Sequence, residues 1–498
     1  DIALEEGILC FTDPNNRTLI DFRQSMLRDV LLQQMAPRRA TCQLHRLAAE
    51  AKQHYFAAQL DLVAHQIAIH YELAGDMTNA LYFTQKAAHS AEKMHRPWQA
   101  AELWSHYIGL CPAELETGDC GKALPDISSA RLQFSILAES LGWYDRAESC
   151  LSHLPMPAET HTGKKRSLCI QGALTRGEIL GKKGRIDDAV EQFTVAHAAS
   201  LTLENGPLIA RSLLGLAKAH HHRGNDELAI TACNKAIEVS SRNKDGSTEA
   251  SGHWLLGRIH RLLGQLDEAR KSFLLSQQLY SDLKNTPGSA RSLYGLALVH
   301  RADNNLVDAE SHFLEAYQQF SALGMIRAMG HCLNGLGEVA RFQDNPPLAR
   351  RYYNDAVSLY HRVGLESDGA KSQTNLGILA RDEGDLNSAQ MIMEKALKVA
   401  ERDEYHYLAV SIALNLCWVY ALQGENERCQ VLLSSYLQRI RENPVLDPDI
   451  ARPLEGIADL LNNRGQMKEA QALYATALDM WERFHRHHDA SRVAAHLQ

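Results

Sequence analysis

The sequence lacks the features of a secreted or membrane-spanning chain. Its ten cysteines are scattered singly, without any CxxC pair, which is typical of a protein from a reducing compartment. The first residues, DIALEEG, are acidic, and no run of about eighteen apolar residues follows anywhere in the chain. We therefore expect a cytoplasmic protein that contacts no membrane.

An excess of positive charge is also missing. The 52 Lys and Arg residues stand against 60 Asp and Glu residues, and the net charge is -8. A protein that binds the phosphate backbone of nucleic acid, or an anionic membrane surface, usually carries an excess of basic residues. We therefore expect no nucleic-acid partner.

Motifs of catalysis and of metal or cofactor binding are absent as well. There is no P-loop, no HExxH pair and no GxSxG elbow. Among the 24 histidines, His220, His260 and His300 lie forty residues apart, which favours a packing role in successive repeats. The groups at 220–222 and 485–488 lack the partners of a zinc site. We expect no enzyme, no cofactor and no metal site.

What is present is a repeat with a fixed period. A Gly or small polar residue is followed, after four residues, by a small residue that opens an amphipathic stretch. Six consecutive intervals between these small residues are identical, at forty positions each, and the first and last intervals are only slightly longer. Such regularity indicates stacked supersecondary units. The small residues are Ala147, Ala189, Ala229, Ala269, Ala309, Ala349, Ala389, Cys429 and Ala470.

Each unit reads as a helix, a tight turn and a second helix, because the apolar residues follow helical spacing on both sides of the turn. The turn glycine is expected to adopt a left-handed conformation, and the Asp, Glu or Asn after it can cap the second helix. Small residues also recur where the two helices would cross, namely Gly177, Ala217, Gly257, Ala297, Gly337, Gly377 and Cys417.

The small residue, the Gly, the Ala and an aromatic four residues later, such as Phe193 or Phe273, together resemble the tetratricopeptide repeat. This resemblance implies an all-α, right-handed superhelical solenoid over residues 126–498. The units are longer than the usual repeat and look like the variant seen in kinesin light chains and bacterial signalling ATPases. The resemblance also implies a protein-binding role.

Residues 1–55 do not follow the period. Residues 20–50 are expected to form two basic amphipathic helices broken at Pro37, which on their own would cap the solenoid. The pattern around Phe22, Leu27 and His45 resembles the end of the winged-helix segment of signal-transducing (STAND-type) NTPases, and residues 67–104 resemble the start of their sensor arm. We thus expect a winged-helix-like segment over 1–55 and irregular helical repeats with a linker over 56–125.

The first helices of the units should line the concave side, where a ligand would bind. Positions counted from the crossing residue predict two basic columns flanking a central strip. One column contains Arg261, Arg301, Arg341 and Arg381; the other contains Arg211, Arg291, His331 and Lys371; the strip contains Trp254, Tyr294 and Asn334. Such a groove suits an acidic peptide. Alternatively, the arginines stabilise helix ends and pair with acidic turn residues, without any ligand.

Three functions remain open. The chain, which has no initiator methionine, is expected to be part of a longer protein in which an upstream nucleotide-binding domain is switched by a ligand on the repeats. Alternatively, it is a free-standing adaptor between proteins. A third hypothesis is a peptide-responsive regulator of the quorum-sensing type.

Overall fold

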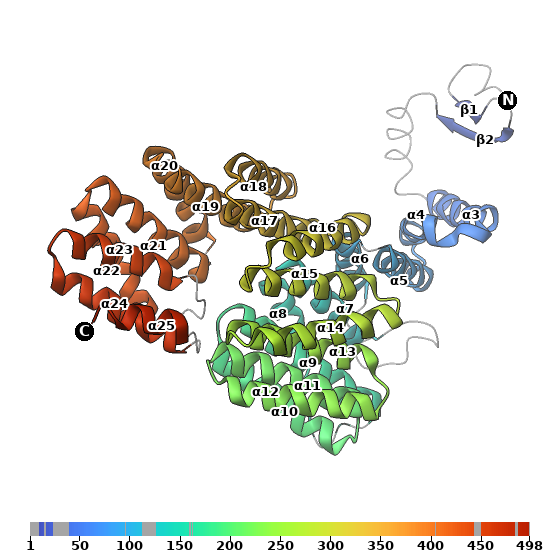
Figure 1. The fold of residues 1–498 in the computed structure, drawn as a ribbon. Helices are drawn as coiled ribbons and strands as arrows, with labels where there is room; N and C mark the ends of the chain where they lie inside the picture. Colours follow the sequence, from blue (N-terminus) through green and yellow to red (C-terminus); the bar gives the residue numbers. More distant parts are fainter. Residues whose placement is uncertain are drawn as a thin grey trace. The chain divides into compact units, whose positions relative to one another are not determined.

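The computed structural model describes residues 9–13, 16–22, 39–94, 96–111, 126–158, 161, 163–403, 405–442, 450–483 and 487–497. The chain divides into two compact units, Asp1–Met156 and Pro157–Gln498. Figure 1 shows that the described elements are almost all helices, which follow one another as packed neighbours. The predicted all-α solenoid of helix pairs is therefore confirmed.

The first unit contains a two-stranded sheet and a series of consecutively packed helices. Its elements are β1 (Leu9–Asp13), β2 (Asn16–Phe22), α3 (Arg39–Tyr55), a short 3-10 helix (Ala57–Gln59), α4 (Leu60–Leu73), α5 (Met77–Lys93), α6 (Pro97–Leu110), α7 (Ile127–Leu141) and α8 (Tyr144–Ser152). The predicted boundaries at residues 55 and 125 stay predictions.

The N-terminal strands correct one expectation. Strands β1 and β2 pair antiparallel, with Phe11 opposite Ile20, so residues 20–22 do not begin a helix. The segment carries β-branched residues in alternation, which a search for helical spacing overlooks. The second expected helix is present as α3. The remainder of the first, including Leu27, Arg28 and Asp29 of the winged-helix-like pattern, lies outside the described residues.

The second unit is the repeat array. Its helices are α9 (Gly163–Lys182), α10 (Ile186–Thr202), α11 (Gly206–His222), α12 (Asp226–Arg242), α13 (Gly246–Leu262), α14 (Leu266–Asp282), α15 (Thr286–Ala302), α16 (Leu306–Ala322), α17 (Ile326–Phe342), α18 (Pro346–His361), α19 (Glu366–Asp382), α20 (Leu386–Arg402), α21 (His406–Gln423), α22 (Asn426–Glu442), α23 (Ala451–Asn463), α24 (Met467–Arg483) and α25 (His487–Ala494).

The period of the repeat follows from the lengths of its helices and turns. Most helices from α11 to α20 have 17 residues, and short turns separate them. The turn glycines adopt the expected left-handed conformation, as in Gly224 with φ 82° and Gly384 with φ 85°. Where a turn lacks Gly, Asn304 and Asp344 take the same conformation, with φ 57° and 55°. The side chain of Asp385 caps α20 by accepting from the Ser388 amide, as predicted.

Small residues at the helix crossings hold aromatic rings in place. The Phe273 ring of α14 packs between Gly257 of its own repeat and Gly295 of the next, and a Cβ at these positions would lie 2.9 and 2.5 Å from the ring. Phe193 is held in the same way by Gly177 and Gly215. The glycines therefore set how closely neighbouring helices approach, and the buried ring fills the space between them.

Polar pairs with a constant sequence separation link one repeat to the next at the turns. Arg270 of α14 donates to Asp303, 2.8 Å away in the following repeat. One period later Gln343 donates to Glu310 at 3.2 Å, and after two periods Arg350 pairs with Glu383. In every pair, one position thus carries a hydrogen-bond donor and the other a carboxylate. Exposed pairs of this kind contribute little stability individually.

The clamp around Phe273 generates a prediction. Gly257→Ala should lower the free energy of unfolding by about 1–3 kcal/mol, because the added methyl meets a ring that Gly295 prevents from moving. Gly369→Ala is the matched control, since its Cβ would lie 3.8 Å from the nearest atom, an ordinary contact. Urea titration of both variants provides the measurement. Equal stability of the two variants would contradict the clamp.

Candidate ligand-binding face

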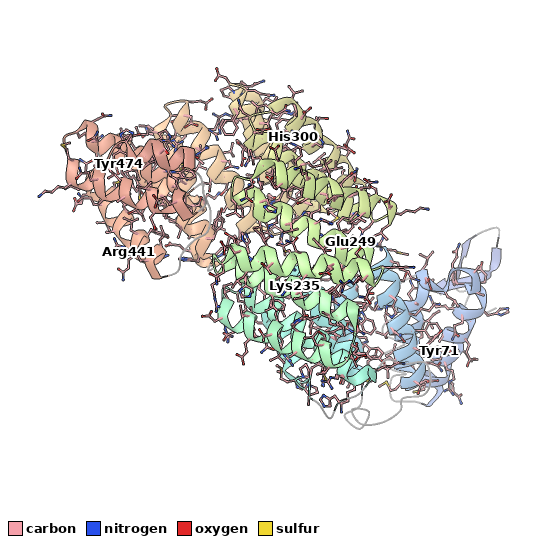
Figure 2. All side chains as sticks on the ribbon, turned by 60° about the horizontal axis from the view of Figure 1, so that its bottom comes forward. Tyr71, Lys235, Glu249, His300, Arg441 and Tyr474 are labelled. Carbon is pink, nitrogen blue, oxygen red and sulfur yellow. The ribbon has the colours of Figure 1, made fainter. Side chains whose placement is uncertain are left out.

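The first helices of successive repeats, α9, α11, α13, α15, α17, α19 and α21, contact one another along the array. The predicted ligand-binding residues all lie on these first helices, and the face that they are predicted to form is called the inner face. Figure 2 shows the side chains of the array, with Glu249 on α13 and His300 on α15 labelled. All residues of the predicted site lie on the first helices from α11 to α19.

The column of Arg261, Arg301, Arg341 and Arg381 is largely neutralised by carboxylates. Arg301 pairs with Glu338 of the next first helix, and Arg341 pairs with Asp382 at 3.2 Å. Arg381 also pairs with Asp382, at 2.8 Å, and its guanidinium lies 3.8 Å from the centre of the Trp418 ring. These contacts link consecutive repeats and agree with the alternative in which the arginines have a structural role. Ligand binding by this column stays a prediction.

The second column is less neutralised. Arg211 is exposed to water on α11, yet desolvation by the surrounding protein lowers its pKa. Arg291 of α15 donates to the Tyr280 hydroxyl at 3.1 Å, and its guanidinium lies 4.5 Å from the centre of the Trp254 ring. Lys371 is exposed on α19. This column therefore keeps cationic side chains available on the inner face.

His331 completes that column and is mostly buried. Its Nδ1 atom lies 3.3 Å from the Tyr360 hydroxyl, and its ring is next to that of Tyr294, with centroids 6.5 Å apart. Desolvation, followed by the charge of Lys371, lowers the pKa of His331 to about 4. His331 is therefore neutral at physiological pH and adds no charge to the face.

The central strip changes character along the array. Trp254 donates from Nε1 to the Arg291 carbonyl at 3.4 Å, and burial raises the pKa of Tyr294 to about 12. Asn334 is 5% exposed, and neither its amide nitrogen nor its carbonyl oxygen has a hydrogen-bond partner among the described residues. A buried amide without partners costs about 1–3 kcal/mol. Asn334 is thus the most unusual polar group on the face.

Arg258 is an inner-face residue that the sequence analysis did not select. Its guanidinium lies 5.2 Å from the centre of the Trp254 ring, on α13. Burial, then the charges of Arg261 and Arg291, lower the pKa of Arg258 to about 10. Arg258 directly follows the crossing residue Gly257, but Leu298 and Ile378 occupy the equivalent position in other repeats, so the sequence shows no basic column there.

The histidines forty residues apart contact their own repeats. His260 lies 2.6 Å from the Gln265 side chain, and the His300 ring stacks on His312 with centroids 5.1 Å apart. Across the described part of the chain, no group of three or more His, Cys, Asp or Glu side chains is arranged to hold a metal ion. None of the described helices combines the length and apolar composition needed to cross a bilayer.

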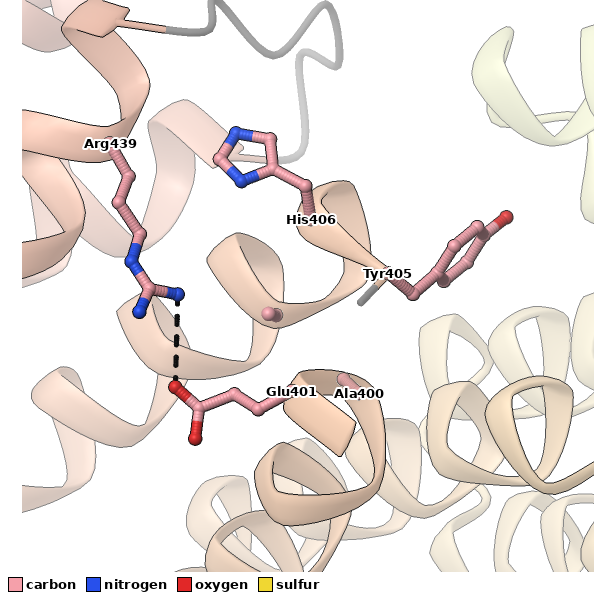
Figure 3. Close-up of a pocket in the computed structure, with 6 residues that line it drawn as sticks. Ala400, Glu401, Tyr405, His406 and Arg439 are labelled. Atoms are coloured by element: carbon pink, nitrogen blue, oxygen red, sulfur yellow. Dashed lines mark ion pairs between the residues drawn. The ribbon is translucent and has the colours of Figure 1, made fainter. Parts of the chain in front are cut away.

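A small cavity of about 360 Å³ lies at the junction of α20, α21 and α22 (Figure 3). It is lined by Ala400, Glu401, Tyr405, His406, Ala409 and Arg439. The Glu401 carboxylate pairs with Arg439 at 3.7 Å and accepts from the Tyr436 hydroxyl at 2.7 Å. Because these charged groups already satisfy one another, the cavity is a weaker candidate than the inner face.

Comparison with known families identifies the repeats. Three segments match models of the tetratricopeptide repeat: residues 174–247, 248–322 and 329–402. Residues 174–322 and 329–402 are tetratricopeptide repeats. The matched segments include every residue of the predicted site. No curated protein has significant sequence similarity to the chain.

Solved structures share the fold of the tetratricopeptide array at low sequence identity. A Rap protein in complex with Competence and Sporulation Factor is 13% identical, with a TM-score of 0.53 over 72% of this chain and 98% of its own. Aspartyl phosphate phosphatase F from Bacillus subtilis is 12% identical, with a TM-score of 0.49 over 71% and 93%. At such identity the likeness to the Rap protein shows the fold alone.

The buried His331 predicts a dependence of stability on pH. Its pKa lies below that of an unfolded histidine, so the unfolded state binds the proton more tightly and stability falls as pH drops from about 6.5 towards 4. His331→Gln should reduce the loss of stability between pH 7 and pH 5.5 by about 1 kcal/mol. Thermal unfolding at both pH values measures the loss. The exposed His361→Gln serves as control, and an identical pH response in both variants would contradict the prediction.

Proposed function

We propose that the inner face of the tetratricopeptide array binds an extended segment of polypeptide. The observation that carries the proposal is the buried Asn334 amide, which has no partner among the described residues. A carboxamide offers two donors and one acceptor, which complement the C=O and N–H groups of a peptide main chain. An extended ligand presents such groups at every residue, so one can reach Asn334 whatever the ligand's sequence.

The position of Asn334 supports this role. It lies on α17, in the strip that joins Tyr294 of α15 to Thr374 of α19. Both amide atoms are out of reach of water, so a ligand must first displace the side chains that cover them. A ligand that enters then removes the penalty of the unpaired amide.

The binding role is compatible with regulation in a larger protein. The resemblance of residues 20–50 and 67–104 to signalling NTPases supports a sensor arm attached to an upstream nucleotide-binding domain. The solenoid fold shared with a Rap protein, itself solved with Competence and Sporulation Factor, supports a peptide-responsive regulator. An adaptor between proteins needs the same inner face. All three hypotheses therefore depend on the same binding test.

A substitution at Asn334 separates stability from binding. Leu174, Leu214 and Leu414 occupy the equivalent position in other repeats, so Asn334→Leu should be accommodated. The variant should gain about 1–3 kcal/mol in stability, because the unpaired amide is removed. It should also lose at least tenfold in affinity, about 1.4 kcal/mol. The ligand is a peptide selected on the wild-type chain from a random dodecapeptide library, and calorimetry measures its affinity.

Thr374→Val is the matched control in the same strip. The Thr374 hydroxyl already donates to the Ala370 carbonyl at 2.8 Å, so its removal should leave peptide affinity unchanged. Unchanged affinity in Asn334→Leu, or selection of peptides that bind another part of the chain, would contradict the proposed function.

A further inference from the structure

Two arginines share one indole on the inner face. The Arg258 guanidinium lies 5.2 Å from the centre of the Trp254 ring and the Arg291 guanidinium lies 4.5 Å from it. Trp254 and Arg258 belong to α13, whereas Arg291 belongs to α15 of the next repeat. Two like charges are therefore held on either side of a repeat boundary by contacts with a single aromatic ring.

At other repeat boundaries of the inner face, some basic residues have a carboxylate partner. Lys218 pairs with Glu178 at 2.6 Å between α11 and α9, and Arg327 pairs with Asp368 at 2.9 Å between α17 and α19. In the part of the chain that the structure describes, neither Arg258 nor Arg291 forms an ion pair with a carboxylate. These two arginines thus differ from Lys218 and Arg327 in having no carboxylate partner among the described residues.

The charges at this boundary repel one another. Arg261 and Arg291 both disfavour the charged form of Arg258, and desolvation acts in the same direction. The rings of Trp254 and Tyr280 hold the Arg291 side chain, which remains exposed to solvent. Repulsion retained between a half-buried and an exposed cation that are both held against one ring is typical of a site whose counter-charge comes with the ligand.

We propose that Arg258 and Arg291 bind an oxyanion of the ligand over the Trp254 ring. Guanidinium groups bind carboxylates and phosphates through paired N–H donors, so both groups fit the site chemically. This inference rests on the proposed binding of a polypeptide to the inner face and adds the anionic group that anchors it. The anchor lies on α13 and α15, so it is one to two first helices away from Asn334 on α17.

The helix spacings between the anchor and Asn334 bound the ligand's length. Packed helices lie about 8–10 Å apart, so Arg291 on α15 and Arg258 on α13 lie about one and two spacings, or about 8–20 Å, from α17. An extended chain covers about 3.3 Å per residue, so the oxyanion and the main-chain group at Asn334 should be about three to six residues apart.

The test uses two probes, hexaglutamate and inorganic phosphate, with thermal unfolding of the full chain at low ionic strength. Hexaglutamate or phosphate should raise the melting temperature of the wild type by several degrees and leave that of Arg258→Ala/Arg291→Ala nearly unchanged. Arg270→Ala is the control, because Arg270 lies on the second helix α14, outside the inner face, and pairs with Asp303. It should respond like the wild type. A response to hexaglutamate assigns the site to carboxylates, and a response to phosphate alone assigns it to a phosphorylated ligand.

The double variant also distinguishes binding from a structural role. Without ligand it should melt at the same temperature as the wild type or above it, because the repulsion is removed. Equal responses of the double variant and the wild type to both probes would overturn the proposal, as would a lowered melting temperature of the unliganded double variant. If the library-selected peptide still depends on Asn334 but not on Arg258 and Arg291, the polypeptide-binding function stands and the oxyanion site is wrong.

Discussion

The close crossing of helices at glycine is the constraint on which the array depends. Phe273 is held between Gly257 and Gly295, so one ring fixes the distance both within its repeat and to the next. Where the ring is replaced by the smaller Cys233, the facing positions are the larger Ala217 and Leu255. Volume is thus compensated locally, as expected of a core packed to crystal density.

This packing places the first helices side by side and brings their charged residues into one narrow face. Most boundaries resolve the resulting repulsion with a carboxylate, as Glu338 does for Arg301. Two features of the face have no such partner among the described residues: the amide of Asn334 and the arginines around Trp254. Both features lower the stability of the fold, and they lie on the same surface. We propose binding at that surface on this physical ground.

Much of the fold could be predicted from the sequence because the repeat presents each constraint many times. The turn glycines, the capping Asp385 and the crossing residues recur at a fixed period, so local chemistry and global packing agree. The N-terminal hairpin occurs once and has no such repetition, and a helix was wrongly expected at residues 20–22.

The candidate site could be predicted only in outline. Periodicity predicts that Arg301 and Trp254 lie on one face, but it contains no information about pairing between repeats. Glu338 and Asp382, which neutralise the predicted arginines, lie in the following repeat and belong to no periodic column of their own. The unpaired state of Asn334 depends on the side chains packed around it, which a single sequence does not reveal.

The central claim is that a polypeptide lies along the inner face across α13, α15 and α17. Photo-cross-linking tests it most directly, with the library-selected peptide carrying a benzophenone at each position in turn and mass spectrometry locating the linked residues. The account predicts links to these three first helices, shifting from α13 towards α17, or the reverse, as the label moves along the peptide. Links confined to the second helices or to residues 39–156 would contradict it.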